Sequence, residues 1–208
     1  METVILASAS PRRSELLSRV GIPFRTVHPD LDESDLLRGA GPEIVTAISI
    51  KKVEAATKKV ESAAGRFKGE SPKWIIGADT VVEIDGRLLG KPAGNEEAGE
   101  FLRLLSGKVH RVHTGLALLP DPGKRIVVRS CTTEVKFQDF SASELDFYLR
   151  SGEWSGAAGA YRIQERGGLF VQWVRGSYSN VVGLPLETLY LMLKDAGYVF
   201  EYQDSIPR

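Results

Sequence analysis

Residues 6–13 read Leu-Ala-Ser-Ala-Ser-Pro-Arg-Arg, and they join an apolar run to the start of a helix. Ser10 is typical of a helix N-cap, and Pro11 suits the first helical position, where no backbone N–H is needed. The helix N-terminus offers unpaired N–H groups, and Arg12 and Arg13 add two permanent charges with forked donors. This stretch therefore predicts a strand-to-helix junction that binds an anion such as a polyphosphate. The alternative is an ordinary capped surface helix whose arginines are solvated.

The rest of the chain alternates between strand patterns and helix patterns. Apolar or alternating runs predict strands at 4–6, 24–28, 74–84, 112–119 and 126–137. Helical spacing with capping residues predicts helices at 11–20, 42–64, 95–107, 141–152 and 186–193. Asp85-Gly86 is a strong hairpin signal, and the region from 112 to 137 is expected to be antiparallel. The pattern indicates an α/β fold with a mixed, twisted sheet and flanking helices.

Composition limits the class of protein. The chain has 208 residues, of which 42% are hydrophobic, enough for one large domain or two small lobes. Lys plus Arg equals Asp plus Glu at 27 each, so we expect no nucleic-acid partner and no membrane partner, and any anion site must be local. The single Cys131 cannot form an internal disulfide, and no apolar run approaches ~18 residues. We expect a cytoplasmic protein.

Several motifs occur in a fixed order after the first loop. They are Gly77-Ala78-Asp79-Thr80, Gly90-Lys91-Pro92, Gly159-Ala160-Tyr161 with Ile163-Gln164, and the run from Gly176 to Pro185. Together with residues 6–13, this set resembles the Maf family of nucleotide pyrophosphatases over nearly the whole chain. The resemblance implies an inosine-triphosphatase-like fold in which residues 1–208 form a single domain, with a cleft between two lobes. Homodimers are common among similar proteins, although the sequence does not determine the oligomeric state.

The resemblance also implies roles for individual residues. Asp79 matches the carboxylate that accepts a proton in Maf-like enzymes. The phosphate chain would be held by Ser8, Arg13, Lys52 and Lys91. Without the resemblance, a lone aspartate at a strand end is more often a backbone hydrogen-bond acceptor, and lysines are more often solvated.

Substrate selection is implied for a second set of positions, Arg12, Thr80 and Gln164. This combination resembles the branch of the family that acts on dTTP and UTP rather than on 7-methyl-GTP. A glutamine amide supplies both a donor and an acceptor, which can pair with the O4 and N3–H edge of uracil or thymine.

A divalent metal is expected as the cofactor. An aspartate in water has a pKa near ~3.9 and is a weak base at neutral pH, so we favour a metal that activates the attacking water. Mg²⁺, with Mn²⁺ as the alternative, needs few protein carboxylates when phosphate oxygens complete its shell. Asp79 is the first expected ligand, and Glu33, in the acidic run after Asp30, is the second.

Three positions depart from the family pattern. Ala157 stands where a lysine is common, and Arg162 and Glu165 stand where glycines are common. One charge is lost and two are added. Arg162 compensates for the lost lysine only if its side chain reaches the cleft.

The expected function is hydrolysis of dTTP and UTP, and of modified pyrimidine nucleotides, to the monophosphate and pyrophosphate. Such an enzyme would have a house-cleaning role, in which it removes unwanted nucleoside triphosphates from the nucleotide pool. One alternative is a nucleotide-binding regulator of septum formation with little hydrolysis. A nucleotidyltransferase is a third hypothesis, because it also uses an arginine-rich loop with a carboxylate and a metal.

Overall fold

The computed structural model describes residues 1–31, 39–62, 73–121 and 124–201. Its strands are β1 (Val4–Ala7), β2 (Phe24–Thr26), β3 (Trp74–Ile84), β4 (Arg87–Leu89), β5 (Val109–Leu119), β6 (Val127–Phe137) and β7 (Val171–Arg175). Its helices are α1 (Pro11–Arg19), α2 (Gly41–Ser62), α3 (Asn95–Leu105), α4 (Ala142–Ser151), α5 (Tyr178–Val182) and α6 (Leu186–Asp195). Two 3₁₀ turns, η2 (Ala158–Ala160) and η3 (Arg166–Phe170), precede β7.

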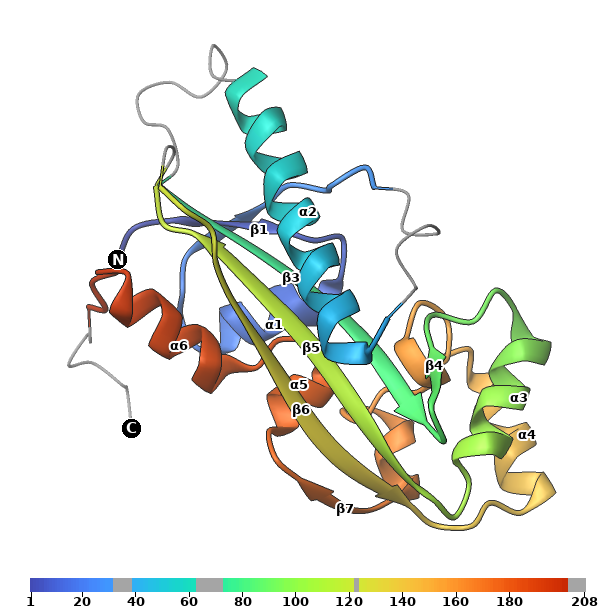
Figure 1. Ribbon diagram of the computed structural model, residues 1–208. Coiled ribbons are helices and arrows are strands. Elements are labelled where there is room, and N and C mark those ends of the chain that lie inside the picture. The colour runs from blue at the N-terminus through green and yellow to red at the C-terminus, as the bar shows by residue number, and fades with distance from the viewer. Residues whose placement is uncertain (32–38, 63–72, 122–123, 202–208) are drawn as a thin grey trace.

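The strands form one mixed sheet in the order β2-β1-β3-β5-β6-β7, with β4 paired to β3. β1 runs parallel to both β2 and β3, whereas the ladder from β3 through β5 and β6 to β7 is antiparallel. Figure 1 shows α2 lying across the long strands, α1 and α6 near the N-terminal strand, and α3 and α4 grouped beside β4. The expected α/β fold with a mixed sheet is confirmed.

The hairpin between β3 and β4 forms where the sequence predicts it. Ile84 pairs with Arg87, so Asp85 and Gly86 are the two turn residues. Both have positive φ, 49° and 75°, which is the conformation that a tight two-residue hairpin requires. The capping box of α4 is also confirmed, because the Ser141 side chain accepts from the Glu144 N–H and the Glu144 side chain accepts from the Ser141 N–H.

Two glycines let α2 approach the sheet closely. A Cβ on Gly77 in β3 would lie 2.4 Å from the Ser49 carbonyl oxygen, and one on Gly115 in β5 would lie 2.3 Å from the Val45 carbonyl oxygen. Any side chain at either position would push α2 outward. Because α2 carries Lys52, this close contact sets how deeply that lysine enters the fold.

Some elements differ from the sequence prediction. β2 ends at Thr26 rather than at residue 28. α3 has Gly94 as its N-cap rather than Asn95, because the chain enters the helix extended at Gly94. β7 and α5 were not predicted: β7 is a short edge strand, and α5 spans only five residues, too few for a periodic pattern. Within the described ranges, no helix is both long and apolar enough to span a bilayer.

Candidate active site

A pocket of about 380 Å³ lies where β1 ends beside β3. The last pair between these strands is Ala7 with Gly77, but β3 continues to Ile84. The chain leaves β1 and turns into α1, so residues after Ala7 face the part of β3 beyond Gly77 across the pocket. This geometry lets neighbouring β3 residues, whose side chains leave opposite faces of the sheet, contribute to one cavity.

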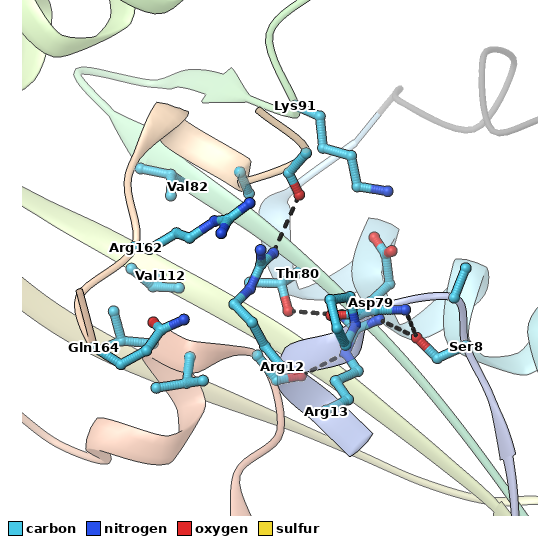
Figure 2. Close-up of a pocket in the computed structure, with 18 of the residues that line it drawn as sticks. Ser8, Arg12, Arg13, Asp79, Thr80, Val82, Lys91, Val112, Arg162 and Gln164 are labelled. Carbon is cyan, nitrogen blue, oxygen red and sulfur yellow. Dashed lines mark hydrogen bonds between the residues drawn. The ribbon is translucent and has the colours of Figure 1, made fainter. Parts of the chain in front are cut away.

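The pocket brings together nearly all of the residues expected at the site. Its lining includes Ser8, Arg12, Arg13, Lys52, Asp79, Thr80, Lys91 and Gln164. Glu33 lies outside the described residues. Arg162, one of the three departures from the family pattern, also lines the pocket (Figure 2).

One end of the pocket, here called the charged end, consists of Ser8, Arg13, Lys52 and Asp79. At its centre, the buried Arg13 donates three hydrogen bonds. Its Nε donates to the Gly183 carbonyl at 2.7 Å, Nη1 to Ser8 Oγ at 3.1 Å and Nη2 to Thr80 Oγ1 at 3.0 Å. Arg13 therefore ties the β1–α1 loop to β3 and to the segment after α5.

Lys52 and Asp79 form an ion pair at the charged end. Lys52 Nζ lies 2.6 Å from Asp79 Oδ1, and the two side chains are only 7% and 13% exposed. Asp79 is on the same face of β3 as Gly77, two residues earlier, which is the face that α2 covers. The close approach of α2 thus brings the lysine to the carboxylate.

Arg12 faces the middle of the pocket instead of the protein interior. Its Nη2 donates to the Gly156 carbonyl at 3.1 Å, and Arg162 Nη2 donates to the neighbouring Ser155 carbonyl at 3.0 Å. Burial, followed by repulsion from Arg162 and Arg13, lowers the pKa of Arg12 to about 10. Arg12 remains charged at neutral pH, and a bound anion would relieve this repulsion.

The other end, here called the apolar end, consists of Val82, Val112, Tyr161, Arg162 and Gln164. Figure 2 shows Val82, Val112, Arg162 and Gln164 on the opposite side of the pocket from Asp79 and Ser8. Both polar atoms of the Gln164 amide are buried, and neither has a hydrogen-bond partner among the described residues. A buried unpaired amide is costly, so a ligand that supplies both a donor and an acceptor would be stabilised here.

Tyr161 is fixed from behind by a residue outside the pocket. Its hydroxyl shares a 2.9 Å hydrogen bond with His110 Nε2, and Phe137 contacts both rings edge-on. Burial lowers the pKa of His110 to about 3, so this histidine is neutral at physiological pH.

The sequence analysis assigned no role to Asn180, which supports the site. Asn180 is fully buried, and its Nδ2 donates to the Val112 carbonyl and to Thr133 Oγ1. The backbone carbonyl of Asn180 accepts from Thr114 Oγ1, which in turn bonds Thr80 Oγ1 at 2.9 Å. Asn180 lies inside the Gly176–Pro185 motif that the sequence analysis identified. Nothing in the sequence showed that its side chain bonds both β5 and β6.

Asp79 is the sole carboxylate among the described residues that line the pocket. In the described part of the chain, no group of three or more His, Cys, Asp and Glu side chains is arranged to hold a metal ion. One carboxylate is nevertheless within the range that Mg²⁺ uses when phosphate oxygens and water supply its other ligands. The donors present therefore fit a cation that binds together with a phosphate chain.

A family model described as "Maf-like protein" matches residues 3–196. A protein from Thermococcus gammatolerans named dTTP/UTP pyrophosphatase is 44% identical over 195 residues, which cover 94% of this chain and 97% of the relative. A protein of the same name from Clostridium acetobutylicum is 41% identical over 196 residues, which cover 93% of this chain and 98% of the relative.

Solved structures show the same fold at lower sequence identity. The chain superposes on a HAM1 protein from Coxiella burnetii with a TM-score of 0.51 at 17% identity, covering 94% of this chain and 100% of the other. The Staphylococcus aureus Ham1 protein gives a TM-score of 0.50, also at 17% identity, covering 93% of this chain and 99% of the other. These likenesses concern the fold alone.

Proposed function

The chain belongs to the Maf family, and from this premise we propose that it is a nucleoside triphosphate pyrophosphatase that converts dTTP and UTP to the monophosphate and pyrophosphate. The observation that carries the proposal is the two-ended pocket. Its charged end suits a phosphate chain, and its apolar end suits a flat base with a polar edge.

The charge of the pocket supports a triphosphate ligand. Among the described lining residues, the cations are Arg12, Arg13, Lys52, Lys91 and Arg162, against the single carboxylate of Asp79. A charge pair at ~4 Å is worth about 4 kcal/mol at an effective dielectric near 20, so several such contacts together offset desolvation of the phosphates. The net charge of the whole chain is zero, so this concentration of positive charge is local.

Asp79 is proposed to accept the proton of the attacking water. The water oxygen forms a bond to the α-phosphorus, the bond from that phosphorus to the α–β bridging oxygen breaks, and pyrophosphate leaves. Ser8, Arg13, Lys52 and Lys91 are proposed to hold the phosphates in line for this displacement. Lys52 keeps the Asp79 carboxylate in place through the 2.6 Å ion pair.

A divalent cation is proposed as the cofactor, with Mg²⁺ as the preferred ion. When bound, such an ion neutralises phosphate charge and lowers the pKa of coordinated water. Asp79 would supply the protein ligand from the pocket, and Glu33 remains the proposed second ligand. Mn²⁺ offers similar oxygen coordination and is the natural substitute in an assay.

The test is turnover of UTP labelled at the α-phosphate, with Mg²⁺ present and the products separated. We expect labelled UMP and inorganic pyrophosphate from the wild type, and a loss of about 10²–10⁴-fold in kcat for Asp79→Asn. The matched control is Asp85→Asn, which changes an exposed aspartate at the β3–β4 turn and should leave kcat unchanged. Release of inorganic phosphate, with UDP as the other product, would contradict the proposed bond cleavage.

The same assay separates the alternative functions. A regulator of septum formation would bind UTP without turnover in both wild type and Asp79→Asn, an outcome that the names of the relatives do not favour. A nucleotidyltransferase would move the label into an acceptor molecule instead of free UMP.

A further inference from the structure

The Thr80 hydroxyl lies between the two ends of the pocket. Along β3, Asp79 at the charged end comes directly before Thr80, and Val82 at the apolar end follows two residues later. On the neighbouring strand β5, Val112 pairs with Val82 and also lines the apolar end. Figure 2 shows Thr80 between Asp79 and Val112. A ligand that spans the pocket therefore passes Thr80 with its middle part.

Hydrogen bonds inside the protein fix the direction in which the Thr80 proton points. Thr114 Oγ1 donates to the backbone carbonyl of Asn180 at 3.1 Å. A hydroxyl has one proton and two lone pairs, so Thr114 has no second proton to give to Thr80. In the 2.9 Å bond between the two threonine hydroxyls, Thr80 is therefore the donor and Thr114 the acceptor.

The Asn180 carbonyl holds the Thr114 proton because it has no helical donor. α5 ends at Val182, and the N–H of Leu184, four residues after Asn180, bonds the Ser179 carbonyl at 3.0 Å instead. Thr114 and Asn180 are both fully buried, so turning the Thr114 proton away would leave a buried carbonyl unpaired, which is costly. The side-chain bonds of Asn180 to β5 and β6 hold this carbonyl in place.

Toward a ligand, the Thr80 hydroxyl can only accept. Arg13 Nη2 donates to Thr80 Oγ1 at 3.0 Å and uses one of its two lone pairs. Because the proton is directed to Thr114, the group that Thr80 offers to the pocket is the second lone pair. Thr80 is half-buried and lines the pocket, so a ligand can reach this lone pair.

The Ser8 hydroxyl is fixed in the opposite sense by the same arginine. Ser8 Oγ accepts from Arg13 Nη1 and from the Ser10 N–H, both at 3.1 Å. Both lone pairs are used, so Ser8 can only donate to a ligand. A donor suits a phosphate oxygen, whereas the lone pair of Thr80 would repel one. The ligand group that meets Thr80 must therefore be a hydrogen-bond donor.

We infer that Thr80 accepts a hydrogen bond from the 3′-hydroxyl of the nucleotide sugar, and that Thr114 and Asn180 are positioning residues that keep Thr80 an acceptor. This inference rests on the proposed function in taking a nucleotide, with its base at the apolar end, as the ligand. The sugar is then the part that lies between the phosphates and the base, and its hydroxyls are its donors. The proposed substrates dTTP and UTP both carry the 3′-hydroxyl, whereas dTTP lacks the 2′-hydroxyl. Only a bond to the 3′-hydroxyl serves both substrates.

The first test measures what each sugar hydroxyl contributes to product binding. Calorimetry compares the wild-type affinity for dTMP with that for its 3′-deoxy analogue, and the affinity for UMP with that for dUMP. Removing the 3′-hydroxyl should weaken binding about 10-fold, and kcat/KM for the matching triphosphates should fall by a similar factor. Removing the 2′-hydroxyl should change the affinity less than about 2-fold. Equal affinities for dTMP and its 3′-deoxy analogue, or a larger loss from the 2′-hydroxyl, would overturn the inference.

The second test concerns the direction of the Thr80 proton. A dTMP analogue with fluorine in place of the 3′-hydroxyl offers lone pairs but no proton, so the wild type should bind it no better than the 3′-deoxy analogue. Thr114→Val has nearly the same shape but no hydroxyl, which lets the Thr80 proton turn toward the ligand. The affinity for the fluoro analogue relative to dTMP should then rise about 2- to 5-fold. Thr114→Ser keeps the hydroxyl and should retain the wild-type ratio, whereas an unchanged ratio in Thr114→Val would overturn the role of Thr114.

Thr80→Val tests the same contact if Thr114→Val does not fold. Without the hydroxyl, the affinities for dTMP and its 3′-deoxy analogue should agree within about 2-fold, and a retained preference for dTMP would overturn the inference. Thr57→Val is the matched control, because Thr57 is half-buried on α2, donates to the Val53 carbonyl and lies outside the pocket. Its ratios should equal those of the wild type. Product binding that depends on the 3′-hydroxyl, without hydrolysis of UTP, would overturn the proposed function but leave the inference standing.

Discussion

The two ends of the pocket differ in how their polar groups are satisfied. At the charged end, Arg13 bonds three protein groups and Lys52 pairs with Asp79. At the apolar end, both polar atoms of Gln164 and the Nε of Arg162 have no partner among the described residues. A buried charge without a partner costs far more than a buried neutral amide without one. The charged groups must therefore be paired within the protein, whereas the folded protein tolerates an amide that has no partner until a ligand binds.

This contrast predicts that substitutions at the charged end lower the free energy of unfolding most, and that substitutions at the apolar end mainly weaken ligand binding. The largest expected effect is at Lys52. Lys52→Met leaves the Asp79 carboxylate buried and unpaired, so we expect the free energy of unfolding to fall by about 3–5 kcal/mol in urea denaturation. Adding Asp79→Asn to Lys52→Met should restore most of that loss.

The control for Lys52 lies on the same helix. Lys59 pairs with Asp30, but the side chains are 41% and 84% exposed. Lys59→Met should therefore change the free energy of unfolding by less than about 1 kcal/mol. Equal losses for the two lysine variants would show that burial does not distinguish the pairs.

Arg13 should give the next largest effect. Arg13→Lys keeps the charge, but a single ammonium cannot reach the Gly183, Ser8 and Thr80 acceptors in the same geometry. We expect a loss of about 2–3 kcal/mol in the free energy of unfolding, measured by the same denaturation assay. Arg19→Lys, at the exposed end of α1, should be neutral. A neutral Arg13→Lys would mean that the three hydrogen bonds contribute little.

His110, which bonds Tyr161 at the apolar end, should make stability depend on pH. His110 has a folded-state pKa of about 3, against about 6.5 when unfolded, so only the unfolded chain takes up the proton between these values. Stability is full above pH 6.5, decreases as the pH falls, and the loss saturates near pH 3. At pH 5 the contribution is about 2 kcal/mol.

The measurement is the free energy of unfolding at pH 5 and pH 7 for wild type and His110→Gln. The variant should lose that part of the pH dependence, whatever its stability at pH 7. Burial also lowers the pKa of His113, so a smaller dependence of the same sign should remain. An unchanged slope in His110→Gln would refute the assignment to His110.

The smallest effect on stability is expected at Gln164. Gln164→Met replaces a buried amide that bonds none of the described residues with an apolar side chain of similar size, so the free energy of unfolding should change by less than about 1 kcal/mol. KM for UTP should nevertheless rise at least about 10-fold, because the base loses its amide partner. A large loss of stability would mean that the amide has a structural partner.

Much of the fold follows from local signals in the sequence. The β3–β4 turn needs two residues that tolerate positive φ, and Asp85-Gly86 meets that need without help from the rest of the chain. The α4 capping box is equally local. β7 was not predicted, because a five-residue edge strand forms through its pairing with β6, and the residues of β7 alone do not encode that pairing. The division of residues 1–208 into two lobes stays a prediction.

The site residues were predicted from ordered motifs, but the sequence could not show what each one touches. Arg12 and Arg13 look equivalent in the chain, and both line the pocket, yet Arg13 is buried and donates hydrogen bonds to Gly183, Ser8 and Thr80, whereas Arg12 is less buried. Likewise, the sequence did not show whether the Arg162 side chain reaches the cleft, and the structure places Arg162 in the pocket lining.

The sequence by itself determined which residue types are available, the alternation of strands and helices, and the start of α1 at Pro11, because these depend on neighbours within a few positions. Only the tertiary structure decided that Lys52 pairs with Asp79 and that the Gln164 amide has no hydrogen-bond partner among the described residues. Those outcomes depend on how closely α2 packs on Gly77 and Gly115 and on where β1 ends beside β3. Such distances join residues far apart in the chain, and no local pattern encodes them.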